Sequence, residues 1–310
     1  MKAGIAPGAE PMAGCRLWAD SGTRIEMTRE DEIAGYRPTV EVRVVVCGHG
    51  RVGGSFARSC VLAAIPTWVI DVQSVVYQMP TILPIGMNAA MSVKFVPPVS
   101  LPTLWYLCTP EHVNDDLVRQ ICESPGFNRA TDCIAVASAT WDTSRVPEDL
   151  GASVGRAHPL HPFPPAATLM PVPCGTPFGT SGLPEFAIHL LESMGFVPFA
   201  LDDQDRYLYH AAAVLVSNLP AALVQQAAGI FMRCGVPDGH VVAAGMLCAL
   251  AEVISTSGPA SVPGPAARGD HLTVKADQDA IDRHDPDTGH VHRILSEVIV
   301  KMTSGSDNSR

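Results

Sequence analysis

The chain has 310 residues, 47% of them hydrophobic, and a formal net charge of −10. This acidic balance, without a basic stripe, argues against a nucleic-acid partner. The N-terminus has no apolar signal core and no apolar run has the length of a membrane span, so a cytoplasmic protein without a membrane partner is expected. Nine cysteines occur without a C-x-x-C pair, which favours reduced, buried thiols over disulfides or zinc.

Residues 1–40 are rich in Gly, Ala and Pro, and we expect a loose extension there. Residues 42–46 then form a β-branched run that is typical of a buried strand, and a helical pattern follows the glycine turn behind it. Gly48 allows a tight turn, Gly50 lets a pyrophosphate approach the backbone, and Gly53 lets the helix pack closely on the strand. The alternative is a glycine-rich turn without a nucleotide. The predicted dinucleotide-binding residues in this turn are Gly48, His49, Gly50, Arg51, Val52 and Gly53.

A second predicted strand, at 66–70, ends in Asp71. This carboxylate follows the glycines by roughly 20 residues, as in the dinucleotide fingerprint, where it binds the ribose hydroxyls. It would repel a 2′-phosphate and therefore favours NAD. Arg51 is a weak indication of NADP, because its side chain could meet a phosphate. We expect NAD or NADP as cofactor, with NAD slightly favoured.

Residues 72–103 are irregular, and only 92–96 has the character of a strand. Thr109 and Pro110 follow the next buried strand at its carboxyl end, the edge where open α/β sheets bind ligands, so both are assigned to the cofactor site. The further regular elements predicted in this half are strands at 104–108, 133–137 and 196–200, and helices at 113–121 and 183–194.

Two histidines, His158 and His161, lie in the segment 155–163, and a proline directly follows each of them. The X-Pro steps predict a stiff loop of extended or turn geometry. A three-residue spacing suggests a metal site, but the segment is not helical and has no Cys, Asp or Glu partner close by. The sequence favours a substrate-facing or structural histidine, and no metal is assigned.

A long apolar helix is predicted over 206–234. The polar side chains on one narrow face of it are Arg206, His210 and Ser217, with Asn218 on the flank. Polar groups on an apolar helix must find partners, so they form either a satisfied network or the wall of an active site. Pro220 removes a backbone hydrogen bond and predicts a kink beside Asn218.

A second apolar helix is predicted from Pro237 to about 256, and we expect its nearly uniform apolar surface to be buried against another subunit. A stiff loop at 257–270 carries Arg268 and Asp270. Two further helices are predicted, at 271–283 and 290–302.

Four segments of this chain resemble a known protein family. They are GHGRVGGSFA at 48–57, AHPLHPF at 157–163, YHAAAVLVSN at 209–218 and GPASVPGPAARGD at 258–270. The family is described as a Rossmann-like domain followed by a helical domain of unknown function. It is related to pyrroline-carboxylate reductases, ketopantoate reductases and hydroxyisobutyrate dehydrogenases.

The resemblance implies an α/β fold with a Rossmann-type, mostly parallel sheet, followed by an all-α dimerisation domain like that of 6-phosphogluconate dehydrogenase. The implied division is an extension at 1–40, a nucleotide domain at 41–203, a helical domain at 204–303 and a tail at 304–310. A cleft between the domains would hold nicotinamide and substrate. The residues that would line it are His158, His210, Ser217, Asn218, Arg268 and Asp270.

The chain departs from the family pattern in three places. Arg206 stands where the family often has lysine, and arginine binds an oxyanion but is a poor proton donor. His161 replaces a frequent glutamine. The run 138–140, Ser-Ala-Thr, replaces a more usual His-x-Ser-Gly. These differences put a lysine-type general acid in doubt.

The leading hypothesis is an NAD(P)-dependent reductase or dehydrogenase that acts as a homodimer on a C=O or C=N bond of a small, carboxylated metabolite. His210 is the candidate acid, because its ordinary pKa lies near neutrality. The other expected roles are Asn218 and Ser217 orienting the acceptor atom, Arg206 or Arg268 and Asp270 binding substrate, and His158 closing the site. Two alternatives remain open: an NAD(P)-binding sensor without turnover, and a metal hydrolase using His158 and His161.

Overall fold

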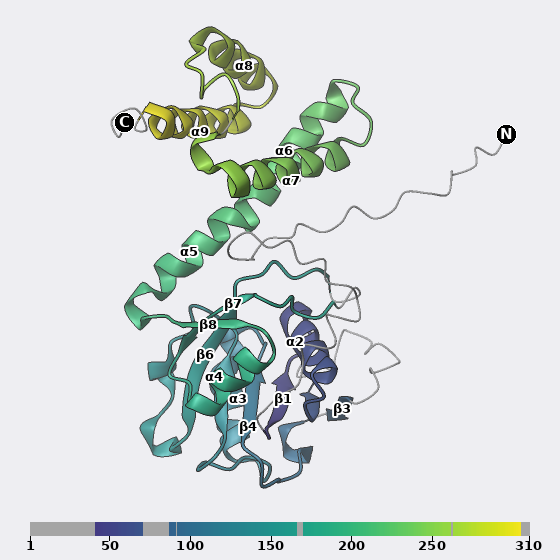
Figure 1. Ribbon diagram of the computed structural model, residues 1–310, viewed down its shortest axis with the longest axis vertical. Helices are drawn as coiled ribbons and strands as arrows, with labels where there is room; N and C mark the ends of the chain where they lie inside the picture. The colour runs from purple at the N-terminus through teal and green to yellow at the C-terminus, as the bar shows by residue number, and fades with distance from the viewer. Residues whose placement is uncertain (1–40, 71–86, 91, 166–169, 262, 305–310) are drawn as a thin grey trace, which may run out of the picture. The chain divides into compact units, whose positions relative to one another are not determined.

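The computed structural model describes residues 41–304 except 71–86, 91, 166–169 and 262 (Figure 1). The described residues divide into two compact units, one reaching Leu215 and the other beginning at Val216. We call them the α/β unit and the helical unit. The extension expected at 1–40 lies outside the described residues.

The α/β unit is built on one eight-stranded sheet with the order β3-β2-β1-β4-β5-β6-β7-β8. Its strands are β1 (Arg43–Cys47), β2 (Thr67–Ile70), β3 (Met87–Ala90), β4 (Thr103–Leu107), β5 (Cys133–Val136), β6 (Ser153–Pro159), β7 (Pro177–Ser181) and β8 (Val197–Ala200). Every neighbouring pair is parallel except β6 and β7. The predicted mostly parallel, Rossmann-type sheet is confirmed.

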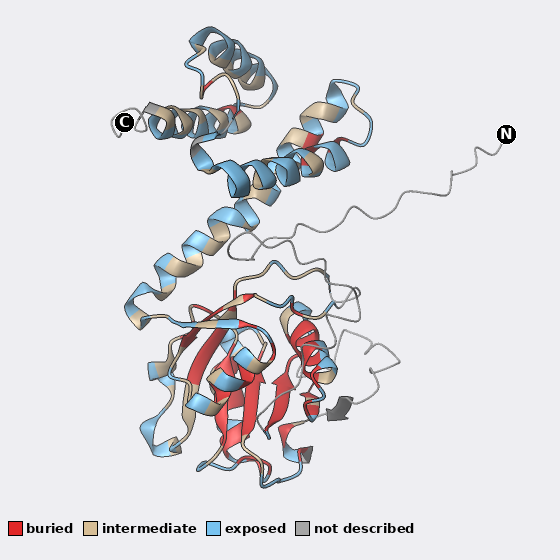
Figure 2. Ribbon diagram, in the orientation of Figure 1, coloured by how far each residue is buried: buried red, intermediate tan, exposed pale blue. Residues whose placement is uncertain are grey.

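Both faces of the sheet are covered, as the β-branched run in β1 predicts. Val44 and Val46 join one hydrophobic cluster and Val45 and Cys47 join the other, because successive side chains of a strand point to opposite faces. Helices α2 (Arg51–Leu62) and α4 (Glu185–Ser193) pack into the first cluster, and α3 (Glu111–Cys122) packs into the second. The buried residues of Figure 2 follow these strands and helices.

Three predicted details of this unit are wrong. The expected strand at 92–96 is a short 3-10 turn, Val93–Phe95, in which Ser92 Oγ accepts a hydrogen bond from the backbone N–H of Lys94. Strand β7 lies in the proline-rich region where no strand was predicted. His158 lies in strand β6 rather than on a loop. The strand ends at Pro159, because proline has no N–H with which to continue the ladder.

The long helix predicted over 206–234 is divided in two. Helix α5 (Arg206–Val216) ends before Ser217, whose φ of −120° is not helical, and α6 (Asn218–Arg233) begins after it. Pro220 explains the interruption, because it has no N–H to donate to the carbonyl of Val216.

The remaining helices of the helical unit are α7 (Gly239–Ser257), α8 (His271–His284) and α9 (Pro286–Ser304). Helix α7 begins two residues after Pro237, because Asp238 has a left-handed backbone with a φ of 51°. The two helices predicted after residue 270 are present.

Candidate functional site

The glycine turn after β1 has the close packing that the dinucleotide motif requires. Gly48 has a φ of +99°, and a Cβ atom there would lie 2.8 Å from the carbonyl oxygen of Cys108. A Cβ atom on Gly53 would lie 1.9 Å from the carbonyl oxygen of Gly48. A Cβ atom on Gly50, by contrast, would meet nothing within 4 Å. The turn is therefore closed against the protein at Gly48 and Gly53 and open at Gly50.

Helix α2 begins at this open glycine, at the carboxyl edge of the sheet. Gly50 is its N-cap, no side chain caps it, and its first turn carries no acidic residue. The first amides of a helix have no intrahelical acceptor, so they are available to an anion at this end. This cradle fits the pyrophosphate of a dinucleotide. Arg51 is exposed in the first turn, and Asp71, the predicted ribose ligand, lies outside the described residues.

The other predicted cofactor residues lie around the same turn. Thr109 Cγ2 would be 3.1 Å from a Cβ atom on Gly48, so this side chain is beside the turn, and its hydroxyl donates to Asn114 Oδ1 over 2.6 Å. Pro110 is the N-cap residue of α3. His49 is half-buried between the strand and the helix, and Val52 is half-buried in the first turn of α2.

Two of the predicted catalytic residues, His158 and His210, are neighbours in the α/β unit. Their ring centroids are 6.2 Å apart, and the rings meet edge to face. His158 Nδ1 lies 3.0 Å from the hydroxyl of Tyr209. Burial, together with the nearby His210, lowers the pKa of His158 to about 4, so its ring is neutral at physiological pH. The Nδ1 atom of His210 is buried and has no hydrogen-bond partner.

A carboxylate next to this pair was not predicted. Glu111 begins α3 directly after Pro110 and accepts hydrogen bonds from the hydroxyls of Ser138 and Thr140. Burial alone raises its pKa, but these bonds, with nearby Arg145 and His210, outweigh burial and hold the pKa below its usual value. The signal in the sequence was an acid and two hydroxyls at the carboxyl ends of adjacent strands.

Arg206, a predicted substrate ligand, is already paired inside the α/β unit. Its guanidinium lies 3.4 Å from Asp142 Oδ2 and donates to the carbonyl oxygen of Asp203 over 2.9 Å. Asp203 in turn pairs with Arg156, which is 1% exposed. These contacts attach the start of α5 to the sheet.

The other predicted site residues belong to the helical unit. Ser217 donates a hydrogen bond to Asn218 Oδ1 over 2.9 Å. Asp270 caps α8 by accepting hydrogen bonds from the hydroxyl of Thr273 over 2.7 Å and from its backbone N–H over 3.1 Å, and these bonds lower the pKa of its carboxyl group. Arg268 is exposed. The structure therefore gives Asp270 a local capping role.

His161, the second member of the suggested metal pair, has a different neighbour from His158. Its ring meets that of Phe163 edge to face at 5.1 Å, and burial lowers its pKa. Within 41–304, leaving out the undescribed gaps, no three His, Cys, Asp or Glu side chains are grouped to hold a metal ion.

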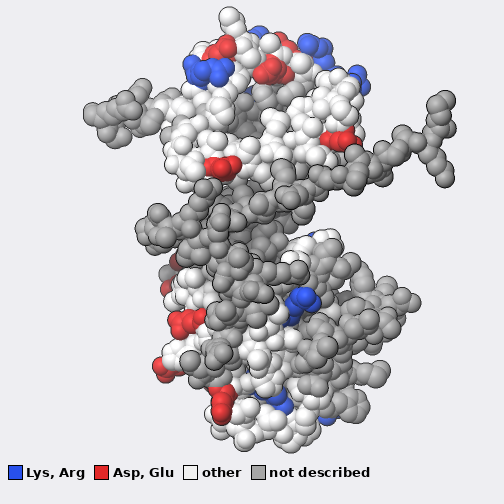
Figure 3. Space-filling model, turned by 45° about the vertical axis from the view of Figure 1, so that its right-hand side comes forward, with Lys and Arg blue, Asp and Glu red and all other residues white. Residues whose placement is uncertain are grey.

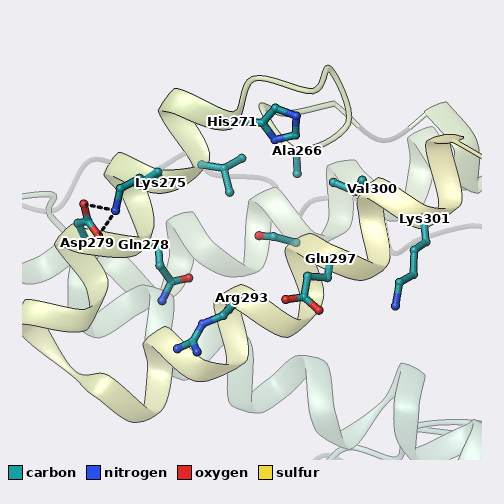
Figure 4. A pocket seen from close by; sticks show the side chains of 11 residues that line it. Ala266, His271, Lys275, Gln278, Asp279, Arg293, Glu297, Val300 and Lys301 are labelled. Carbon is teal, nitrogen blue, oxygen red and sulfur yellow. Dashed lines mark hydrogen bonds and ion pairs between the residues drawn. The ribbon is translucent and has the colours of Figure 1, made fainter.

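A groove of about 590 Å³ lies between α8 and α9 of the helical unit (Figure 4). Its rim carries both signs of charge, including an ion pair of 3.2 Å between Lys275 and Asp279, with Arg293 and Glu297 on the opposite helix. None of the predicted catalytic or cofactor-binding residues lines it. We therefore place the candidate active site at the sheet edge.

Two helical stretches, Asp203–Arg233 and Gly239–Ser257, are long and apolar enough to cross a membrane. The expectation that no apolar run has this length is thus wrong. Length and composition are weak grounds for a membrane span, since an apolar helix that packs against protein satisfies both. The first stretch also contains the break at Ser217.

Comparison with known proteins supports the predicted resemblance. Residues 179–299 match a family described as a domain of unknown function, DUF2520. No curated protein sequence matches the chain. The resemblance predicted from the four segments is confirmed by this match and by the shared fold.

Three solved structures are similar to this one over nearly their whole length. A Bacteroides fragilis protein provisionally named as an NADP oxidoreductase is 16% identical with a TM-score of 0.61, covering 84% of this chain and 98% of its own. Pyrroline carboxylate reductase of Plasmodium falciparum, with NADP bound, is 8% identical with a TM-score of 0.54, covering 84% and 99%. An imine reductase of Myxococcus stipitatus, in complex with NADP+, is 13% identical with a TM-score of 0.51, covering 86% and 95%.

Proposed function

From these matches and the geometry of the glycine turn, we propose that the protein is an NAD(P)-dependent oxidoreductase. It transfers a hydride to or from a C=O or C=N bond of a small metabolite. The observation that carries the proposal is the glycine cradle, in which Gly48 and Gly53 are pressed against backbone while Gly50 faces open space at an uncapped helix start. The similar structures named for NADP support the same cofactor class.

The residues that would hold the cofactor are those of the turn and the first turn of α2. The amides of α2 bind the pyrophosphate, and Thr109 borders the turn on the side of β4. Exposed Arg51 is the residue that would meet a 2′-phosphate, whereas Asp71 would reject one. NAD and NADP are therefore both retained, and Arg51 is the residue to vary.

The chemistry at the sheet edge follows from the charges of the described residues. The nicotinamide supplies or accepts the hydride when it is bound. His210 is the proposed proton carrier, because an imidazole can hold and release a proton and its ring lies near the Glu111 carboxylate. Arg206 is a weaker candidate for a substrate carboxylate than the sequence suggested, since Asp142 already pairs with it. The substrate roles of Ser217, Asn218, Arg268 and Asp270 stay predictions.

A homodimer formed through the helical unit is part of the proposal. Large apolar side chains are exposed along its helices, among them Leu219, Leu223, Val241, Met246 and Ile294. On the face drawn in Figure 3 much of this unit is uncharged, and its Lys and Arg side chains gather towards the end where α8 and α9 lie. A second copy of the same unit would remove this surface from water.

The test is a fluorescence titration with NADH and NADPH, followed by turnover on a panel of keto acids and cyclic imines. We expect binding of at least one coenzyme and its oxidation by one substrate class. His210→Ala should abolish turnover and keep coenzyme binding, while His189→Ala, at an exposed histidine on α4, should change neither. Absence of binding to both coenzymes refutes the proposal, and binding without turnover across the panel supports the sensor instead.

A further inference from the structure

The hydroxyl of Tyr209 is held in a crowded place between β6 and β7. A Cβ atom on Gly179 would lie 2.9 Å from this hydroxyl, so only glycine leaves room for it. The ring of Tyr209 meets Phe199 at 5.9 Å and His158 at 5.5 Å, both edge to face. The side chain is therefore fixed by packing as well as by its hydrogen bonds.

The hydrogen-bond partners of this hydroxyl decide where its hydrogen goes. As a phenol, Tyr209 has one O–H hydrogen to donate. Two acceptors are near: Nδ1 of His158 at 3.0 Å and the carbonyl oxygen of His158 at 3.5 Å. The shorter distance favours Nδ1, since a separation of 3.5 Å is at the limit for an O–H···O bond.

We infer that Tyr209 fixes the tautomer of His158, so that this ring carries its hydrogen on Nε2 and serves as a neutral hydrogen-bond donor, not as a proton carrier. A neutral imidazole has one donor nitrogen and one acceptor nitrogen. When Nδ1 accepts from the phenol, Nε2–H is the donor that remains for another molecule. Tyr209 is thus a positioning residue that acts through His158.

The inference gives the two histidines different roles: His158 donates a hydrogen bond and His210 transfers a proton. It rests on the proposed function. Among the residues that the structure describes, the polar groups beside the His158 ring are the Tyr209 hydroxyl and the ring of His210, and neither is an anion that would stabilise an imidazolium. His210 instead has the ionised Glu111 near it. In a reduction, His158 donates a hydrogen bond to the substrate oxygen or nitrogen. In that reduction the bound coenzyme would supply the hydride to the carbon, and His210 would supply the proton to the same substrate oxygen or nitrogen.

The tautomer can be measured without any turnover. In ¹⁵N–¹H spectra of the histidine rings of the full chain, we expect a single Nε2–H pattern for His158 between pH 6 and 8, identified by its loss in His158→Gln. Tyr209→Phe should give a mixture of both tautomers. Tyr207→Phe, at the exposed tyrosine two residues earlier, is the matched control and should leave the pattern unchanged. An Nδ1–H pattern in the unaltered protein, or an unchanged pattern in Tyr209→Phe, overturns the inference.

A kinetic measurement separates this inference from the proposed function. Tyr209→Phe should lower kcat on the order of 10-fold while the Kd for the coenzyme stays the same, as expected for a residue that orients a catalytic group. Gly179→Ala, which displaces the hydroxyl, should have the same effect. If the unaltered protein turns over no substrate, the redox proposal fails and the ring spectra still decide the tautomer. If turnover is normal in Tyr209→Phe, the role of Tyr209 fails and the redox proposal stands.

Discussion

The two units of this protein differ in how completely they bury their apolar side chains. In the α/β unit, large side chains such as Trp105, Tyr106 and Phe56 are removed almost completely from water on both faces of the sheet. In the described part of the helical unit, every buried residue is glycine or alanine (Figure 2). They are Ala228, Gly239, Ala243, Ala266 and Gly289. The first unit has a complete core, and the second has none built from large side chains.

The difference teaches where the fold of each unit comes from. Burial of apolar side chains is the main force that stabilises a domain, and short helices are marginal without it. The helical unit exposes Met246 by 61% and Val241 by 70% on α7 alone. Its apolar faces therefore need a cover from outside the described chain, whereas the glycine turn and the histidine pair stand on a core that is already complete.

The largest effect is expected at the glycine turn of the α/β unit. Gly53→Ala places a methyl group on the backbone of Gly48, and it should destabilise the unit by more than about 3 kcal/mol and abolish coenzyme binding. Gly50→Ala meets no protein atom, so thermal unfolding should be unchanged. Its methyl group occupies the path of the pyrophosphate, so affinity should fall about 10-fold or more, which is about 1.4 kcal/mol. Unchanged NADH and NADPH affinity in Gly50→Ala contradicts the site.

The next effect concerns the uncovered helices. Met246→Glu puts a charge on the apolar face of α7 and should convert the proposed dimer into a monomer with a less stable helical unit. Light scattering after size-exclusion chromatography measures the mass. Gln225→Glu, at an exposed polar position on α6, is the control and should remain dimeric. If the unsubstituted protein is a monomer, the proposed dimer is excluded. If it then co-sediments with lipid vesicles, a membrane is what covers the apolar helices.

The sequence predicted the parts of this molecule whose causes are local. The strand–glycine–helix order around residues 42–64 predicted β1, the turn and α2, because each glycine has a backbone reason at its own position. The tertiary neighbours could not be read in the same way. Glu111 joins Ser138 and Thr140, which lie 27 and 29 positions further along the chain. From the sequence Arg206 was a candidate to bind a substrate carboxylate, but in the structure it pairs with Asp142 of the loop after β5. Strand β7 was missed because it follows a proline-rich stretch, although it pairs with β6 on one side and β8 on the other.

A smaller effect should follow from breaking the attachment of α5 to the sheet. Asp203→Ala removes the partner of Arg156, which is 1% exposed and would be left as an uncompensated buried charge. Since Asp203 itself is about half exposed, the cost should be near the lower end for such pairs, about 3 kcal/mol. Denaturant unfolding of the variant measures this free energy. Asp202→Ala, at the exposed neighbour, should cost much less, and equal costs would show that Arg156 does not depend on Asp203.

The smallest effect is a pH dependence that belongs to the α/β unit alone. The pKa of His158 is about 4 in the folded protein, below the ordinary histidine value of about 6.5, because burial disfavours the charged ring. Between these values the unfolded chain binds more protons than the folded one, so the free energy of unfolding falls as pH falls through this window. From pH 7 to pH 5 the loss should be about 2 kcal/mol. His158→Gln should remove this slope, and His189→Gln, at an exposed ring on α4, should keep it. If the slope survives in His158→Gln, the ring is not held neutral by the fold, and its role as a hydrogen-bond donor loses its physical basis.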